Sequence, residues 1–265
     1  MDLLALITGN GLIEPWAVAF ACAGLTLAGF IDAIAGGGGL ISTPTFLIAG
    51  LPIHTVIATN KLSNCMGTAV ATAKYIKEGF MRWRLVLPCV AAAMIGSSIG
   101  AHAALAAPEN LLRIVMLVVI PVAGFYVLRN KKLGSGKEPW PARTELALCF
   151  GISLAMGFYD GFYGPGTGAF LMLLLTGLGH LKLTDAAGTT KAVNLTTNVS
   201  ALVVFLLNGT VMVPLGLLCG LFNVAGSWLG ARLFTSKGAA VARPVLLVVL
   251  VIFAARVIAE LLGLA

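Results

Sequence analysis

Long uncharged runs of mostly hydrophobic residues, interrupted by short polar breaks, dominate the pattern along the chain. Residues 85–101, 114–128 and 192–231 contain no charged side chain. Runs of about 20 such residues predict helices long enough to cross a lipid bilayer. A transmembrane β-barrel is excluded, because its strands would alternate between hydrophobic and polar residues with a period of two. The pattern therefore predicts an all-α polytopic membrane protein.

The same order of elements is predicted twice. A first helix (residues 16–35 and 145–163) is followed by a glycine-rich break and by a short apolar segment (residues 40–50 and 169–179). The short segments cannot cross a bilayer as straight helices. Three longer helices follow in each half, at residues 55–77, 84–106 and 109–129 and then at residues 184–207, 211–234 and 240–262.

A sequence repeat explains this duplication. The motif Gly-Phe-Ile-Asp that ends at Asp32 matches Gly-Phe-Tyr-Asp ending at Asp160, and Thr59, Lys61 and Asn64 later match Thr189, Lys191 and Asn194. Residues 130–142 combine Gly, Pro and charge, which is typical of a linker. We therefore expect a first transmembrane repeat at residues 1–129, a cytoplasmic linker at residues 130–142 and a second repeat at residues 143–265.

Composition and charge agree with a membrane protein. Hydrophobic residues make up 59% of the 265 residues and charged residues only 10%. The net charge of +7 is best read as an orientation signal, because Lys and Arg collect in cytoplasmic loops, so no nucleic-acid partner is expected. The five cysteines lack CxxC spacing and are interpreted as small hydrophobic side chains.

The positions of the basic residues predict how the repeats lie in the membrane. In the first half they gather near residue 80 and after the last helix, at Lys74, Lys77, Arg82, Arg84, Arg129, Lys131, Lys132 and Lys137. In the second half the equivalent turn, residues 208–214, is uncharged, and the next turn is surrounded by Arg232, Lys237 and Arg243. Because the bias changes sides, we expect residues 75–84 and 130–142 in the cytoplasm and residues 208–214 in the periplasm.

This change of sides predicts two inverted repeats, each with about four long helices plus one short broken helix at a Gly-rich break. Inversion requires an odd number of crossings in each half, so the short segment would help to complete a crossing. The alternative interpretation has eight spans, re-entrant short segments and parallel repeats.

Two lysines within the membrane are the strongest candidates for a substrate site. An ionisable group at membrane depth costs several kcal/mol unless it is paired or lines a wet cavity. Hydroxyl and amide donors flank each lysine, so the expected substrate-binding residues are Thr59, Asn60, Lys61 and Asn64 with Thr190, Lys191, Asn194 and Asn198. The glycine-rich breaks could direct backbone N–H groups at an oxyanion, through Gly37, Gly38, Gly39, Gly166 and Thr167. The alternative is that both lysines snorkel to a membrane surface.

Two aspartates stand in otherwise hydrophobic helices. Asp32 and Asp160 each lie four residues before a glycine of the break, Gly36 and Gly164. Three roles compete: structural pairing with the lysines, capping of the broken helix ends, or a change of protonation that couples transport to protons.

The chain resembles the sulfite exporter (TauE/SafE) family, also called the sulfonate uptake permeases, and within it the YfcA-like branch. The resemblance rests on GFIDAIAGGGGLISTP with ATNKLSN and, again, on GFYDGFYGPGTGAF with GTTKAVNLTTN. It covers essentially the whole chain. It implies a multi-pass transporter of the bacterial inner membrane that moves sulfur-containing anions such as sulfite or organosulfonates, often by export.

The expected function is therefore a secondary transporter of small sulfur-containing anions, working by alternating access around a central anion site. A passive anion channel is the main alternative, because the same donors could select ions without coupling. An enzyme is not expected, since HExxH and GxGD motifs are absent. Nor is a cofactor or metal. The expected partners are a small anionic substrate and the lipid bilayer, and a homodimer is left open.

Overall fold

The computed structural model describes residues 7–9, 11, 13–108, 111, 138–238, 240–242, 244–245 and 248. Its long elements within these residues are all helices, in two sets of four. The first set is α2 (Pro15–Ala35), α3 (Gly39–Ile48), α4 (Ile53–Lys77) and α5 (Trp83–Ala106). The second is α7 (Ala142–Phe162), α8 (Thr167–Gly177), α9 (Leu183–Leu207) and α10 (Val213–Lys237). The helix predicted at residues 109–129, most of that at 240–262 and most of the linker lie outside the described residues.

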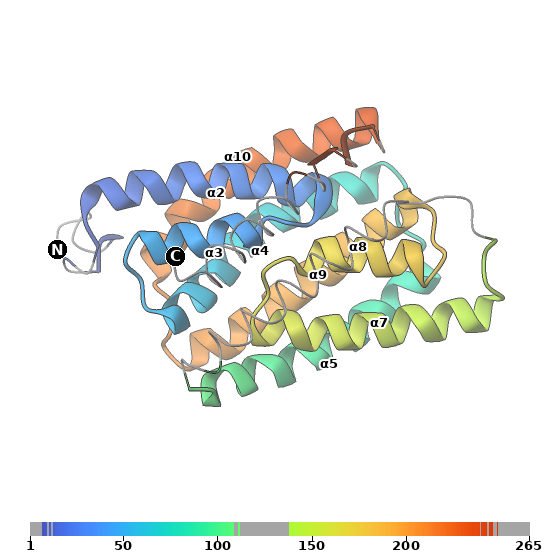
Figure 1. Cartoon of the computed structure of the whole chain (residues 1–265), viewed down its shortest axis with the longest axis horizontal. Coiled ribbons are helices and arrows are strands. Elements are labelled where there is room, and N and C mark those ends of the chain that lie inside the picture. Colours follow the sequence, from blue (N-terminus) through green and yellow to red (C-terminus); the bar gives the residue numbers. More distant parts are fainter. Residues whose placement is uncertain are drawn as a thin grey trace, which may run out of the picture.

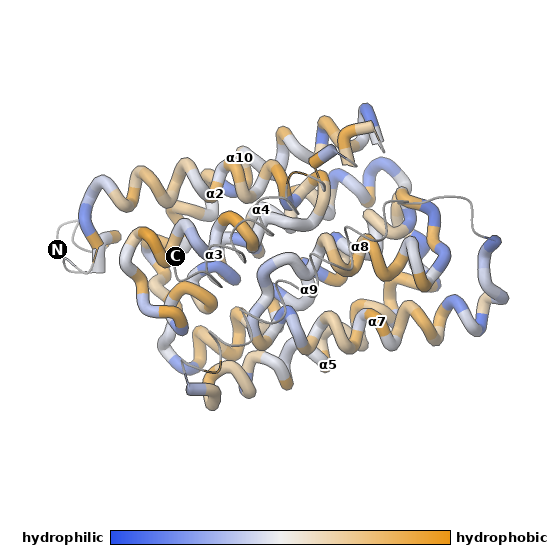
Figure 2. The backbone as a smooth tube through the Cα atoms, in the orientation of Figure 1, coloured by the Kyte–Doolittle hydropathy of each residue, from blue (hydrophilic) through white to orange (hydrophobic). Residues whose placement is uncertain are grey.

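The prediction of an all-α membrane protein is confirmed for this part of the chain. Five helices are long and hydrophobic enough to span a membrane, namely α2, α5, α7, α9 and α10. Helix α4 is as long as α9, with 25 residues, but carries more polar residues. Figure 2 shows hydrophobic colours along most long helices, with hydrophilic positions at the turns and within α4.

The matching helices of the two sets run in opposite directions. Figure 1 shows α2 antiparallel to α7, α4 antiparallel to α9 and α5 antiparallel to α10. The turn that contains Gly79 and the turn that contains Gly209 consequently lie at opposite ends of the helices. Both glycines have a positive φ, 75° and 65°, so the two turns also share their backbone conformation.

The short helices do not continue the path of the helices before them, which corrects the expectation that they help to complete a crossing. Helix α3 packs back along α2. The close approach of the two helices is evident at Gly38, where a Cβ would meet Ala28, and at Gly24, where a Cβ would meet Thr45. Figure 1 shows the same reversal for α8 against α7. Each pair forms a helical hairpin whose tip is a glycine-rich break.

The helices pack as two bundles, and each bundle contains helices from both halves of the sequence. One consists of α2, α3, α4 and α10, and the other of α5, α7, α8 and α9. Glycines allow the close contact of α10 with α2, where a Cβ at Gly226 would overlap the carbonyl of Thr26. Gly96 has the same role between α5 and α7, against Leu154. The bundles meet mainly through α4 and α9.

Candidate functional site

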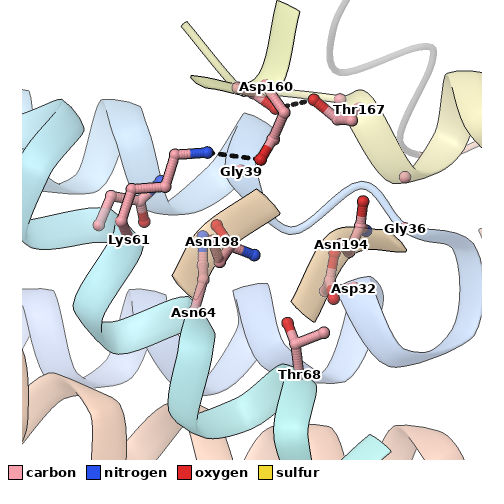
Figure 3. A pocket seen from close by; sticks show the side chains of 14 residues that line it. Asp32, Gly36, Gly39, Lys61, Asn64, Thr68, Asp160, Thr167, Asn194 and Asn198 are labelled. Carbon is pink, nitrogen blue, oxygen red and sulfur yellow. Dashed lines mark hydrogen bonds and ion pairs between the residues drawn. The ribbon is translucent and has the colours of Figure 1, made fainter. Parts of the chain in front are cut away.

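Two buried ion pairs join the bundles at the centre of the molecule. Lys61 Nζ in α4 lies 2.7 Å from Asp160 Oδ2 in α7, as the dashed line in Figure 3 marks. Lys191 Nζ in α9 lies 2.7 Å from Asp32 Oδ2 in α2. The side chains of the two lysines are 3% and 0% exposed. Each half of the sequence therefore supplies the lysine of one pair and the aspartate of the other.

The break after α2 positions Asp32. The helix ends because Gly36 adopts a left-handed conformation, with φ of 75°, and its N–H donates to the carbonyl oxygen of Asp32. Gly38 N–H lies 3.4 Å from Asp32 Oδ1, and Lys191 Nζ donates to the Asp32 carbonyl oxygen as well as to the carboxylate. Of the three predicted roles, pairing with a lysine is thus observed for both aspartates.

The two glycine-rich breaks touch each other backbone to backbone. Ala169 N–H donates to Gly36 O at 3.0 Å, which connects the start of α8 to the end of α2. A Cβ at Gly168 would lie 2.6 Å from Gly36 Cα, and one at Gly39 would lie 3.0 Å from Pro165 Cα. Side chains at these positions would separate the hairpin tips, so glycine here serves close approach.

A small cavity of about 20 Å³ lies between these groups. It is lined by Asp32, Gly36, Gly39, Asn60, Lys61, Asn64, Thr68, Asp160, Gly164, Gly166, Thr167, Gly168, Asn194 and Asn198 (Figure 3). This volume holds about one water molecule. An oxyanion therefore needs some of the surrounding side chains to move before it can occupy the site.

Most of the residues expected at the site line this cavity, and five do not. Thr59 accepts a hydrogen bond from Met212 N at 3.0 Å and so ties α4 to the start of α10. Lys191 lies behind Asp32, to which it is bonded. Thr190, Gly37 and Gly38 are likewise absent from the lining.

Thr68 was missed by the sequence interpretation although it lines the cavity. It occupies the position in the first repeat that Asn198 occupies in the second, as the alignment of Lys61 with Lys191 shows. Asn198 is one of the hydroxyl and amide donors that the sequence predicts around Lys191. The repeat register alone could have identified Thr68, which is 2% exposed.

Polar atoms without a partner mark the walls of the cavity. The Oδ1 atoms of Asn60 and Asn194 are buried and make no hydrogen bond within the described part of the chain, and the two residues are 6% and 5% exposed. Buried polar atoms normally have a partner, because leaving one unpaired costs about 1–3 kcal/mol. An amide can offer either its oxygen or its N–H groups, so these side chains suit a water molecule or a polar ligand.

A second, larger cavity is lined by charged residues that the sequence repeat does not duplicate. It measures about 480 Å³ and lies near Arg82, Glu145 and Asp185. Arg82 donates to both carboxylate oxygens of Glu145, at 2.7 and 3.2 Å, and this hydrogen bonding raises the pKa of Arg82. In the alignment of the two repeats, Arg82 corresponds to Met212 and Asp185 corresponds to Thr55. We therefore interpret this cluster as a structural contact that connects α5, α7 and α9 rather than as half of a duplicated site.

Metal ligation does not explain the central carboxylates. Among the residues that the structure describes, no group of three or more His, Cys, Asp or Glu side chains is arranged to hold a metal ion. The cations that face Asp32 and Asp160 are lysines.

Comparisons with known proteins agree with a transporter. The sequence profile of the family described as "Sulfite exporter TauE/SafE" matches residues 20–257. The chain is 37% identical to "Probable membrane transporter protein ORF9" of Sinorhizobium sp over 92% of its length and 93% of that protein. It is 33% identical to "Probable membrane transporter protein YfcA" of Escherichia coli K12, over 88% of its length and 86% of that protein.

A third relative extends the likeness. "Probable membrane transporter protein" of Haemophilus influenzae is 32% identical over 93% of this chain and 95% of that protein. No solved structure matches the chain. Together with the spanning helices, these relatives identify a multi-pass bacterial membrane protein.

The buried pair of Asp32 and Lys191 predicts a strongly non-additive effect on stability. Asp32→Ala leaves the unexposed Lys191 ammonium without its carboxylate, so we expect the free energy of unfolding to fall by about 3–5 kcal/mol. Asp32→Ala with Lys191→Met removes both charges and should lose clearly less. Thermal unfolding of the purified protein, followed by tryptophan fluorescence, measures both.

Glu78→Ala provides the control, because the Lys74–Glu78 pair is about one third exposed, at 38% and 37%. Its loss should change stability by less than about 1 kcal/mol. Equal stability of the single and double variants at Asp32 and Lys191 would show that the ion pair does not hold the bundles together.

Proposed function

The chain belongs to the sulfite exporter TauE/SafE family, and from this premise we propose that it is a secondary transporter that carries small sulfur-containing anions such as sulfite or organosulfonates across the bacterial inner membrane. The observation that carries the proposal is the central cavity. It lies between two bundles, is lined by amides, hydroxyls and glycines, and contains charged groups supplied by both halves.

The chemistry of the lining suits an oxyanion. Lys61 offers an ammonium, and Asn60, Asn64, Asn194 and Asn198 offer amide N–H groups. Charge-assisted hydrogen bonds from such donors to an oxyanion are roughly twice as strong as neutral ones. Lys191 joins the site when Asp32 moves away from it. The breaks add backbone N–H groups and leave room for a ligand close to the chain.

The charges of the site suggest how transport is coupled. The charges of the two lysines and two aspartates sum to zero. A bound anion would therefore leave an uncompensated negative charge buried in the protein, at a cost of several kcal/mol. Protonation of one carboxylate removes that cost. We therefore propose that the anion replaces Asp160 on Lys61, or Asp32 on Lys191, while the displaced carboxylate takes up a proton.

Replacement of a carboxylate by substrate would also release a contact between bundles. Lys61 and Asp160 lie in different bundles, and so do Lys191 and Asp32. An anion that binds the lysines weakens these connections, and the bundles can then rock about the contact of α4 with α9. This is alternating access, in which substrate binding and the change of conformation share the same atoms.

The opposite directions of the matching helices and the change of sides in the charge bias support an inverted-repeat architecture. Each hairpin of a long and a short helix returns toward its starting end. The odd number of crossings would then come from the three long helices that the sequence predicts after the hairpin, which in the first half are residues 55–77, 84–106 and 109–129. The basic residues favour a cytoplasmic location for residues 75–84 and 130–142.

This orientation predicts the side from which two equivalent turns can be labelled. In a background without native cysteines, we expect Gly209→Cys to react with a membrane-impermeant maleimide in intact spheroplasts. Gly79→Cys should react only after the membrane is permeabilised. Both glycines have open space around the Cβ position, and their positive φ strains a cysteine there by only about 1–2 kcal/mol, so the variants should still fold. Labelling of both residues from the same side would contradict inverted repeats.

A passive anion channel is the second candidate, since a pore lined by the same donors could select anions. The buried ion pairs argue against it, because a permanently open pore would leave the lysines in water rather than against carboxylates. Counterflow distinguishes the two: a carrier exchanges labelled for unlabelled substrate, whereas a channel shows no stimulation from the opposite side.

Transport in proteoliposomes tests the proposal. We expect unlabelled sulfite or sulfoacetate inside the vesicles to accelerate uptake of the same labelled anion. Lys61→Met and Lys191→Met should weaken anion binding by about tenfold, or roughly 1.4 kcal/mol. Lys61→Met with Asp160→Asn, which removes both charges of one pair, controls for folding. Unchanged binding in both lysine variants, with intact folding, would move the substrate site elsewhere.

Proton coupling predicts a selective effect of Asp→Asn substitutions. Asn keeps the shape of the side chain but cannot take up a proton, so Asp160→Asn or Asp32→Asn should abolish accumulation driven by a proton gradient and retain exchange. A purely structural aspartate would lose all modes of transport together. If both variants still accumulate sulfite or sulfoacetate under a proton-motive force, neither aspartate is the coupling group.

A further inference from the structure

The two halves of the central site are not equal, and the difference lies at Asn223. Asn223 is in α10, 2% exposed, and its Nδ2 donates to Oδ1 of Asn64 at 3.1 Å. Asn64 lines the cavity. In the repeat register Asn223 corresponds to Ala93, while its neighbours along the helix, such as Ser227 and Gly226, correspond to identical residues.

A second position changes together with the first. Gly67 in α4 lies against Asn223, and a Cβ at Gly67 would overlap Asn223 Oδ1. Its counterpart in the second half is Thr197. The contact of α4 with α10 therefore combines Gly67 with Asn223, whereas the equivalent contact of α9 with α5 combines Thr197 with Ala93. In each contact, the larger side chain of one helix faces the smaller residue of the other.

The environment of the two equivalent amides differs accordingly. In the bundle that contains α4 and α10, Ser227 Oγ lies 3.2 Å from Asn223 Oδ1, and Asn223 in turn donates to Asn64. In the bundle that contains α9 and α5, Thr197 Oγ1 donates to the backbone oxygen of Asn194, and the side-chain oxygen of Asn194 has no hydrogen-bond partner among the described residues. Asn64 is thus held by a relay of two side chains, while Asn194 is not.

The hydrogen bond to Oδ1 determines which group of the Asn64 amide remains available to a ligand in the cavity. When Asn223 occupies the oxygen of that amide, the Nδ2 group with its two N–H donors remains for the cavity. An anion requires donors, and a buried donor that is already oriented does not lose entropy when the anion binds. Resting on the proposed function, we propose that Asn223 is a positioning residue that fixes Asn64 as a donor to the transported oxyanion.

The repeat itself supplies a variant that removes the amide but restores the packing. Asn223→Ala with Gly67→Thr reproduces the pair Ala93 and Thr197 of the equivalent contact between α5 and α9, so it should fold. We expect it to weaken equilibrium binding of sulfite and of sulfoacetate by about tenfold, the loss of one hydrogen bond to a charged group. Asn64→Ala should weaken binding to the same extent, and the combination of all three substitutions should cause no further loss.

Two comparisons make the result decisive. Ser97→Ala, at the position that matches Ser227, is the control: the hydroxyl of Ser97 donates to the backbone oxygen of Thr197 rather than to a side-chain amide, so affinity should stay unchanged. Asn223→Asp keeps the shape but replaces the donor by a second acceptor, so it should bind anions as weakly as the paired variant.

The outcomes separate this inference from the proposed function. If Asn64→Ala weakens anion binding but the paired variant binds as the unmodified protein does, or if their losses add, Asn223 does not act through Asn64 and the inference is wrong. If Lys61→Met and Asn64→Ala both leave binding unchanged, or if the unmodified protein binds neither anion, the proposed site fails and the inference falls with it.

Discussion

The rest of the structure depends on the need to hold two lysines and two aspartates inside a hydrophobic protein. Each charge would cost several kcal/mol if it were left alone, so every lysine must face a carboxylate. The pairs Lys61–Asp160 and Lys191–Asp32 meet this need only if the lysine of α4 reaches the end of α7 and the lysine of α9 reaches the end of α2. The exchange of helices between halves follows, because an aspartate at the tip of one hairpin reaches the lysine of the opposite repeat.

Glycine makes this arrangement sterically feasible. The tips of the two hairpins contact each other through Gly36 and Gly168, and the long helices approach through residues such as Gly96 and Gly226. These contacts bring the backbone of one half close to the charged groups of the other. A membrane protein cannot rely on the hydrophobic effect to bring helices together within lipid, so close packing and buried polar contacts do so instead.

The sequence predicts the membrane class, the repeat and most of the cavity lining, because ionisable residues in uncharged runs are rare and the repeat shows Lys61 with Lys191 and Asp32 with Asp160. It does not predict which lysine faces which aspartate. Pairing within one half would satisfy the same sequence, and only the packing of α4 and α9 between the hairpins decides. The reversal of α3 was also misjudged, since a short hydrophobic segment has the same composition whether it continues or turns back.

Duplication alone would give a site with two equal halves. The substitution of Asn223 and Gly67 for Ala93 and Thr197 makes the halves differ beside the cavity while it leaves the ion pairs matched. Electrostatic balance is a property of both halves together and must keep its symmetry, because any unmatched charge would be buried. A neutral amide carries no such penalty once it is hydrogen-bonded, so neutral hydrogen-bonding groups are where the two repeats can diverge and adapt the site to its substrate.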